Sequence, residues 1–311
     1  MTVRVVTDST ADLPSEVVRD LDITVVPAYI SFRGRSYRDG IDITQDEIYQ
    51  KLVESDVPIT TSQPPPADFA EAYRHVLKEA DEIVSIQVTS KLSGIYQSAL
   101  QARELVKGKG RIEVVDSTTV SMGLGLIAIA AARLAKSGAS ISGVLEETRQ
   151  AIPQVHVWAV FDTLKYIFRG GRLGKATALL GGMLNVKPML TMRDGVLHPA
   201  GFARTRLKGI EKLLDNFKNY RNIQEVGIVH STTPDEAQSL RCRLSALLDK
   251  NRIHVSRLGP ALGVHGGPGT LILALKGTQI TPGGEEGALE KARKRIQLPS
   301  FHAPKLNMSP P

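Results

Sequence analysis

The chain has 311 residues, of which 42% are hydrophobic and 23% are charged, and its formal net charge is +7. This length and composition can bury a sizeable core and favour two domains. A single cysteine, Cys242, leaves no disulfide framework and no cysteine-based metal site. The basic residues are scattered and aromatic residues make up only 5% of the chain, so the charge does not predict nucleic-acid binding.

Strands and helices alternate in the first half of the chain. Runs of β-forming residues predict strands at 3–7, 23–32, 83–88 and 111–115. Apolar residues at helical spacing predict helices at 46–55, 67–80, 95–105, 121–136 and 140–151. This order predicts a parallel sheet with helices on both faces. The chain starts without an apolar leader and contains no stretch long enough to span a bilayer, so we expect a cytoplasmic protein.

Polar side chains gather where three of the predicted parallel strands end. Asp8 and Ser9 follow the first strand, Ser93 and Gly94 lie between the third strand and its helix, and residues 116–118 follow the fourth. In open α/β sheets, ligands bind at the carboxyl ends of the strands. We therefore expect one polar crevice, where Ser93 and the helix N-terminus receive an anion. The simpler alternative is that Ser93 only caps its helix.

A second group of hydroxyls precedes the predicted helix at 67–80. Thr61, Ser62 and Gln63 are followed by three prolines, which favour an extended and stiff segment. Such a segment can hold hydrogen-bond donors in fixed positions, and it can equally be a plain linker into the helix.

The second half of the chain is less regular. It contains predicted strands at 156–161, 225–230, 253–258 and 270–275, a hairpin of 187–192 and 196–203, and helices at 176–184, 205–217 and 235–248. We expect an N-terminal α/β domain at 1–152 and a C-terminal α+β domain at 153–281 that exchange some segments. Residues 282–311, rich in charge, Gly and Pro, are expected to form a loosely ordered tail.

Two glycine-rich segments of this half carry candidate binding residues. Arg169 and Arg172 lie in the first, which lacks the pattern of a phosphate-binding loop but can grip an anion or a protein surface. His265 lies in the second, predicted to be a loop that passes close to a ligand. No histidine spacing typical of a metal site accompanies it.

Two alternatives to ligand binding of this kind stay open. One is a serine hydrolase with Ser93 as nucleophile and His265 as base, although the chain lacks the Gly-x-Ser-x-Gly elbow and places no acid to orient His265. The other is a binder of a small polar metabolite, which a polar rather than an oily cavity would favour.

Five short motifs in order carry a resemblance to a known family. They are TDSTADL at 7–13, TSQP at 61–64, SKLSG at 90–94, GGR at 170–172 and HGGPG at 265–269. Each is weak alone, but together and at this spacing the chain resembles the DegV family from Val3 to about Lys276. Ile95 and Gly266 depart from the residues common in the family without removing a headgroup ligand.

The resemblance implies a lipid-binding subunit rather than a free-standing enzyme. In the family, one long-chain fatty acid lies with its carboxylate at a domain junction, and a separate ATP-dependent fatty acid kinase converts it to an acyl phosphate. No cofactor or metal is implied beyond the fatty acid itself. The net charge also suits transient contact with an anionic membrane.

The same resemblance assigns roles to particular residues. Thr61, Ser93 and His265 would bind the carboxylate. The residues that would support the headgroup pocket are Asp8, Ser9, Ser62 and Gly94. The kinase would dock at Arg172 and Arg169.

Overall fold

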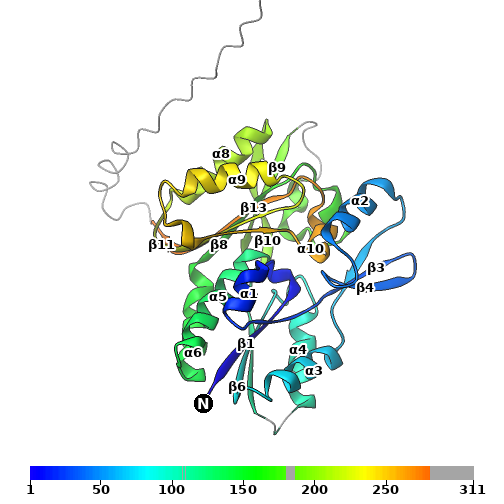
Figure 1. Cartoon of the computed structure of the whole chain (residues 1–311). Helices are drawn as coiled ribbons and strands as arrows, with labels where there is room; N and C mark the ends of the chain where they lie inside the picture. The colour runs from blue at the N-terminus through cyan, green and yellow to red at the C-terminus, as the bar shows by residue number, and fades with distance from the viewer. Residues whose placement is uncertain (107, 109, 180–185, 281–311) are drawn as a thin grey trace, which may run out of the picture. The chain divides into compact units, whose positions relative to one another are not determined.

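The computed structural model describes residues 1–106, 108, 110–179 and 186–280. Within them, residues 1–278 form one compact unit that contains three sheets and the helices packed on them (Figure 1). The predicted tail at 282–311 and the end of the predicted helix at 176–184 lie outside the described residues. No helix in the described part of the chain is both long and apolar enough to cross a membrane.

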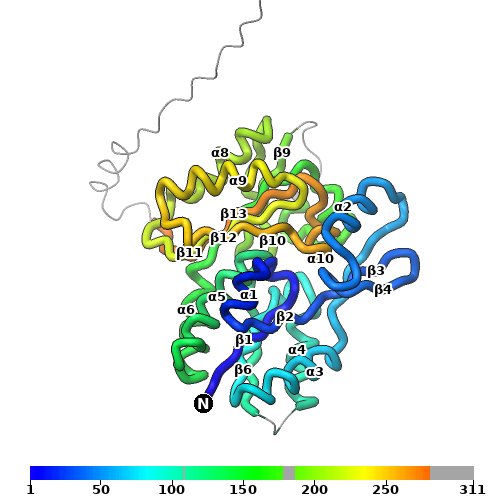
Figure 2. The backbone as a smooth tube through the Cα atoms, viewed as in Figure 1, coloured from blue at the N-terminus to red at the C-terminus, as the bar shows by residue number. Residues whose placement is uncertain are grey.

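The first sheet is parallel, as predicted. Its strands lie in the order β2-β1-β6-β7, with β1 at Val3–Asp8, β2 at Thr24–Val26, β6 at Glu82–Gln87 and β7 at Arg111–Asp116 (Figure 2). Helices α3 (Pro66–Val76) and α4 (Ile95–Leu105) pack together on one face, and α5 (Met122–Lys136) and α6 (Ile141–Ala151) on the other. β6 is buried along its whole length, because it is covered on both faces.

The second sheet is mixed and comes from the second half of the chain. Its order is β10-β9-β8-β13-β11-β12, with β8 at Val155–Val160, β9 at Lys187–Arg193, β10 at Val196–Ala203, β11 at Tyr220–His230, β12 at Ile253–Arg257 and β13 at Leu271–Gln279. β9 and β10 form the predicted hairpin, with positive φ at both turn residues, Asp194 and Gly195. The α/β fold class, with a parallel sheet followed by a second sheet-rich region, is confirmed.

Helix α5 contacts both sheets. It packs on β1 and β6 of the parallel sheet and on β8 and β11 of the mixed sheet. Helices α8 (Arg206–Phe217) and α9 (Pro234–Leu244) pack on strands of the mixed sheet as an outer layer (Figure 1). Because α5 is buried between two sheets, its sequence is apolar almost all round.

The run predicted as one strand at 23–32 is two strands in different sheets. β2 joins the parallel sheet, whereas β3 (Tyr29–Phe32) pairs with β4 (Arg35–Arg38) and β5 (Thr60–Ser62) in a three-stranded antiparallel sheet. Pro27 lies between them and has no N–H with which to continue the ladder. The segment predicted as a stiff loop around Thr61 is therefore an edge strand. Helix α2 (Gln45–Glu54), capped by Thr44, lies between β4 and β5 in the chain.

His265 lies on a helix, so the prediction of a loop there was wrong. Helix α10 (Pro260–Gly266) begins with a proline, at a position where a missing N–H costs nothing, and ends at Gly267 with a φ of +75°. A second helix that the sequence did not predict, α7 (Lys165–Arg169), precedes Gly171, which also has positive φ. Gly171 and Gly267 thus follow the ends of these two helices. Helix α1 (Ser15–Asp20) and the 3-10 turns at Ser9–Ala11, Ile152–Gln154, Gly174–Leu179 and Lys250–Arg252 complete the described elements.

Candidate functional site

A cavity lies between the parallel sheet, the mixed sheet and α10. Its wall is mostly apolar and draws on strands of the mixed sheet, on α10 and on the segments that follow the strands of the parallel sheet. The apolar side chains that line it are those of Ala28, Val88, Leu92, Ile95, Val120, Val157, Ala159, Phe161, Ile167, Leu190, Met192, Leu197, Leu258, Ala261, Leu262 and Ile272. A wall of this kind can receive an extended apolar group.

Five residues predicted from the sequence line this cavity: Thr61, Ser62, Ser93, Arg172 and His265. They come from four separate segments, namely β5, the loop before α4, the loop after α7, and α10. Thr61 bonds His265, and Arg172 bonds the carbonyl oxygen of Leu92, the neighbour of Ser93. The charge of Arg172 is also close enough to His265 to lower its pKa, which connects the two pairs. The structure thus brings hydroxyl, imidazole and guanidinium groups together in one part of an otherwise apolar wall.

The Thr61–His265 pair is the best-defined contact of this group. Thr61 Oγ1 lies 2.7 Å from His265 Nε2. Burial, together with the nearby charge of Arg172, lowers the pKa of His265 to about 4, so the imidazole is neutral at pH 7. With its proton on Nε2, the ring donates to Thr61 and leaves the threonine O–H free to donate to a ligand. His265 Nδ1 is buried and has no hydrogen-bond partner among the described residues.

Ser93 and Gly94 shape the start of α4. Ser93 Oγ accepts a hydrogen bond from the N–H of Ile95 at 3.3 Å, and Gly94, the N-cap residue, provides no side-chain cap. A Cβ at Gly94 would lie 2.9 Å from the Gln63 side chain, so this residue of the TSQP segment packs against the start of α4. The early N–H groups of α4 lie next to the cavity, which Ile95 lines, and such groups favour an anion.

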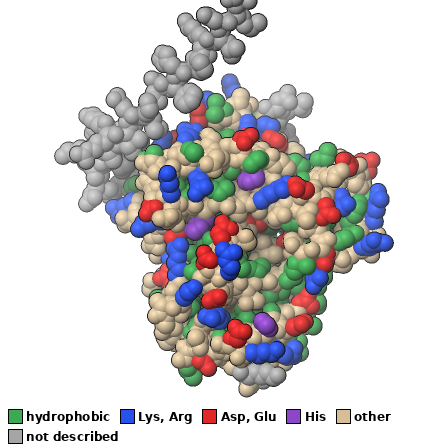
Figure 3. Space-filling view, in the orientation of Figure 1, with side chains coloured by type: hydrophobic (Ala, Val, Ile, Leu, Met, Phe, Trp, Pro, Cys, Tyr) green, Lys and Arg blue, Asp and Glu red, His purple; other side chains and the backbone are tan. Residues whose placement is uncertain are grey.

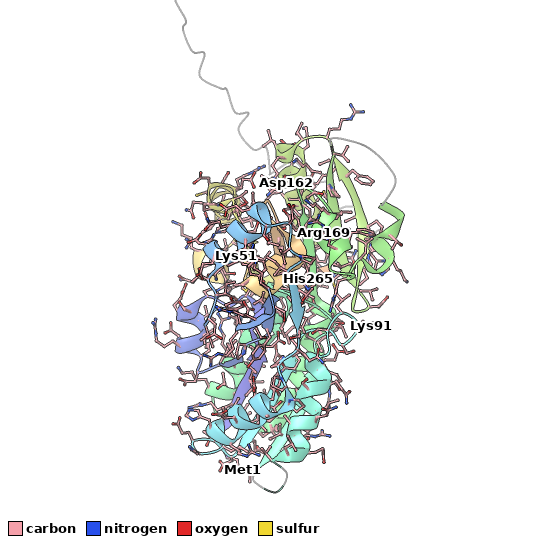
Figure 4. The ribbon with its side chains drawn as sticks, turned by 90° about the vertical axis from the view of Figure 1, so that its right-hand side faces the viewer. Met1, Lys51, Lys91, Asp162, Arg169 and His265 are labelled. Carbon is pink, nitrogen blue, oxygen red and sulfur yellow. The ribbon has the colours of Figure 1, made fainter. Side chains whose placement is uncertain are left out.

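The two predicted docking arginines differ in their surroundings. Arg172 is half-buried and donates to the carbonyl oxygens of Gly170 at 2.5 Å and Leu92 at 3.4 Å, which links it to the loop that carries Ser93. Arg169 is exposed at the end of α7 and does not line the cavity. Figure 4 shows His265 near the middle of the view, with Arg169 above it and Lys91 toward the edge of the molecule.

Asp8 and Ser9 lie behind the cavity rather than on its wall. Asp8 is fully buried and accepts hydrogen bonds from Thr10 and from the N–H of Val88, at 2.9 Å. Ser9 Oγ donates to Asp39 at 2.6 Å and accepts from the N–H of Ala28 at 3.0 Å. Both residues therefore hold neighbours that line the cavity. Residues 116–118, the third polar strand end, do not line it either.

Sequence reasoning missed other residues of the wall. Ser121, Thr191 and Thr270 line the cavity, although their hydroxyl groups donate to Asp12, to the carbonyl oxygen of Val157 and to that of Gly267. The apolar wall carried no separate signal, because Val, Leu and Ile at these positions look like ordinary core residues until the sheets are assembled. Within the described ranges, no three His, Cys, Asp or Glu side chains are placed to hold a metal ion.

The surface shows no single-sign patch on the face seen in Figure 3. Lysine and arginine side chains there are interspersed with aspartate and glutamate. The net charge of +7 is therefore not concentrated on that face.

The fold and the cavity define an α/β protein with a mostly apolar cavity beside its two larger sheets. A family profile described as "Uncharacterised protein, DegV family" matches residues 2–276. The chain belongs to the DegV family.

Three relatives illustrate the similarity. The DegV domain-containing protein TTE1491 of Caldanaerobacter subterraneus is 39% identical over 269 residues, which is 86% of this chain and 95% of that protein. A structure described as fatty acid binding of a DegV family protein from Thermus thermophilus has a TM-score of 0.83 and 37% identity, covering 89% of this chain and 100% of that one. The structure of DegV, described as a fatty acid binding protein from Bacillus subtilis, has a TM-score of 0.78 and 30% identity, covering 89% and 100%.

Proposed function

We propose that this protein binds one long-chain fatty acid and presents its carboxylate to a separate ATP-dependent kinase, which phosphorylates it to an acyl phosphate. The acyl chain would lie along the apolar wall, and Thr61, Ser93 and His265 would hold the carboxylate. The protein itself would contribute no catalytic residue. Because the kinase consumes ATP, the proposal places the pair in the cytoplasm.

The proposal rests on how apolar and polar side chains are distributed over the cavity wall. Most of the wall is apolar, whereas Thr61, Ser93 and His265 add polar groups to it, with Thr61 hydrogen-bonded to His265. A carboxylate is matched by hydroxyl and imidazole donors, and its alkyl chain by aliphatic side chains. Two of the similar solved structures are described as fatty-acid-binding.

The free energy of binding would come chiefly from the acyl chain. Burial contributes about 0.8 kcal/mol per methylene, so a long chain supplies roughly 10 kcal/mol before the costs of ordering it. The hydroxyls would then set the orientation of the carboxylate more than the affinity.

The alternatives from the sequence gain no support at the site. Among the described residues, Ser93 has no hydrogen bond to His265, whose Nε2 is bonded to Thr61. No acid orients Nδ1 of the ring, which has no partner in the described structure. A small polar metabolite would leave the long apolar wall unfilled.

Native mass spectrometry of the purified protein tests the proposal, with denaturing extraction and lipid analysis to identify what is bound. We expect one fatty acid per chain. A protein that is empty and also fails to take up added palmitate or oleate would overturn it. A fluorophosphonate probe gives an independent check, because stoichiometric labelling of Ser93 would favour a hydrolase.

A further inference from the structure

Three side chains from the first part of the chain hold the start of α10. Asp12 Oδ1 accepts a hydrogen bond from the N–H of Gly259 at 2.8 Å, and Asp39 Oδ1 accepts one from the N–H of Ala261 at 3.2 Å. The hydroxyl of Tyr49 donates to the carbonyl oxygen of Leu258 at 3.0 Å. The segment that enters the helix is therefore fixed from outside the mixed sheet.

Each of the two carboxylates is itself held in place. The hydroxyl of Ser121 donates to Asp12 Oδ2, and that of Ser9 donates to Asp39 Oδ2, each at 2.6 Å. Asp12 is 6% exposed and Asp39 is 5% exposed, and neither lines the cavity. Burying a carboxyl group costs free energy unless its hydrogen bonds are satisfied. Because water does not solvate these two groups, we look for their role in the protein groups that they bind.

Helix α10 links these carboxylates to the cavity. It has only seven residues and carries His265 four positions after Ala261, which is about one helical turn. Ala261 and His265 both line the cavity. In a helix this short, the placement of the first residues sets the placement of the imidazole.

We propose that Asp12 and Asp39 are positioning residues: by anchoring the N–H groups of Gly259 and Ala261, they hold α10 so that His265 stays buried against Thr61. The inference rests on the proposed function only in naming His265 as a ligand of the fatty-acid carboxylate. It also gives a role to Asp12 of the TDSTADL motif, whose side chain does not line the cavity.

Burial raises the pKa of Asp12 to about 8 and that of Asp39 to about 6. Asp12 is thus protonated at neutral pH, and an asparagine is a close mimic of that state. In either position the amide oxygen can accept the backbone N–H, and the amide N–H can donate to the serine hydroxyl. Asparagine variants should therefore preserve the contact, whereas alanine variants remove it.

The test follows the imidazole of His265 by proton–carbon NMR in the full chain, with its signal assigned from a His265→Gln variant. In the wild type, followed from about pH 3.5 to pH 8, we expect this signal to titrate with a midpoint near pH 4. Asp12→Ala and Asp39→Ala should raise the pKa of His265 by at least about one unit, because a loosened helix exposes the ring. Asp12→Asn and Asp39→Asn should restore the wild-type behaviour.

Glu225→Gln is the matched control. Glu225 is also buried, at 7% exposure, and bonds His254 and Arg133, away from α10. We expect it to leave the His265 signal unchanged. The proposal is overturned if the alanine variants keep the wild-type titration, or if Glu225→Gln shifts it equally.

The experiment distinguishes a variant that does not fold from one that only misplaces α10. Where an alanine variant fails to fold by near-ultraviolet circular dichroism, Asp12→Ser and Asp39→Ser apply the same test, since serine is too short to reach the helix. The titration is recorded on delipidated protein and without the kinase, so its result does not depend on fatty-acid binding.

Discussion

Thr61 and His265 are 204 positions apart in the chain, yet Thr61 Oγ1 and His265 Nε2 lie 2.7 Å from each other. One residue belongs to an edge strand of the three-stranded sheet and the other to a short helix that connects β12 and β13 of the mixed sheet. Their contact closes the polar part of the cavity from two sides. Under the proposed function, this pair orients the carboxylate toward the kinase.

Thr61→Ala and Ser93→Ala should impair phosphorylation of the bound lipid more than its retention. The acyl chain supplies most of the affinity, while each hydroxyl contributes about 1 kcal/mol. We expect the rate of acyl phosphate formation with ATP and the partner kinase to fall at least about tenfold, because the carboxylate is misplaced. Lipid content, measured by extraction, should stay near one per chain.

The control for these variants is Ser90→Ala. Ser90 is exposed in the loop that also carries Ser93, and it does not line the cavity. It should leave both measurements unchanged. Equal losses of lipid and of phosphorylation in Thr61→Ala would contradict this division of roles.

Ala159→Leu should shift the protein toward shorter fatty acids. Ala159 lies on β8 and lines the cavity, so three added carbons would occupy space meant for the acyl chain. Displacing about three methylenes costs roughly 2.4 kcal/mol, or about a 50-fold loss of affinity for the longest chain that fits. Competition between fatty acids of different length, read by native mass spectrometry, measures this shift.

Ala200→Leu makes the same substitution on β10, at a half-exposed position outside the cavity wall. It should keep the wild-type preference. An unchanged preference in Ala159→Leu would show that the acyl chain does not pass this position.

The parallel sheet and the hairpin could be predicted because their signals are local. Strand propensity followed by an amphipathic helix is visible in β6 and α4, and the Asp194–Gly195 turn is visible between β9 and β10. The helix that carries His265 could not be predicted, since its seven residues contain two glycines and a proline and its first turn depends on distant groups for its hydrogen bonds.

The candidate site was predicted only in part for a similar reason. Thr61, Ser93, Arg172 and His265 lie in short motifs and line one cavity. Asp8 and Ser9 lie in a motif as well, but their side chains turn to Val88 and Asp39 behind the wall. The residue types predicted which functional groups the site contains. The direction in which each side chain points depends on how the sheets pack together.

The buried carboxyl groups predict how stability depends on pH. The folded-state pKa of Asp12, about 8, lies above its ordinary value of 3.8. Its contribution to the free energy of unfolding is therefore fully present below about pH 4 and is lost as the pH rises through 8. The groups that face it are Asp8, Asp39, Tyr49 and Arg257.

Asparagine at position 12 cannot titrate, so the free energy of unfolding of Asp12→Asn, minus that of the wild type, should rise between about pH 5 and pH 8. Urea unfolding at several pH values measures this difference. Asp42→Asn is the comparison, because hydrogen bonds from Arg38 lower the pKa of Asp42 to about 2 and confine its effect to acid pH. A difference for Asp12→Asn that stays flat or falls would contradict the expectation.

Arg169→Ala should weaken productive encounter with the kinase without emptying the cavity. Arg169 is exposed at the end of α7, beside Phe168, whose side chain is 58% exposed, and it does not touch the lipid site. An exposed charge at the rim of an interface acts mainly on the association rate, so we expect the apparent KM of the kinase for the loaded protein to rise about three- to tenfold at low salt and less at high salt. Arg19→Ala on α1 removes a comparably exposed arginine elsewhere and should leave the KM unchanged. The same rise in KM for both variants would mean that net charge, rather than a docking site at Arg169, governs the encounter.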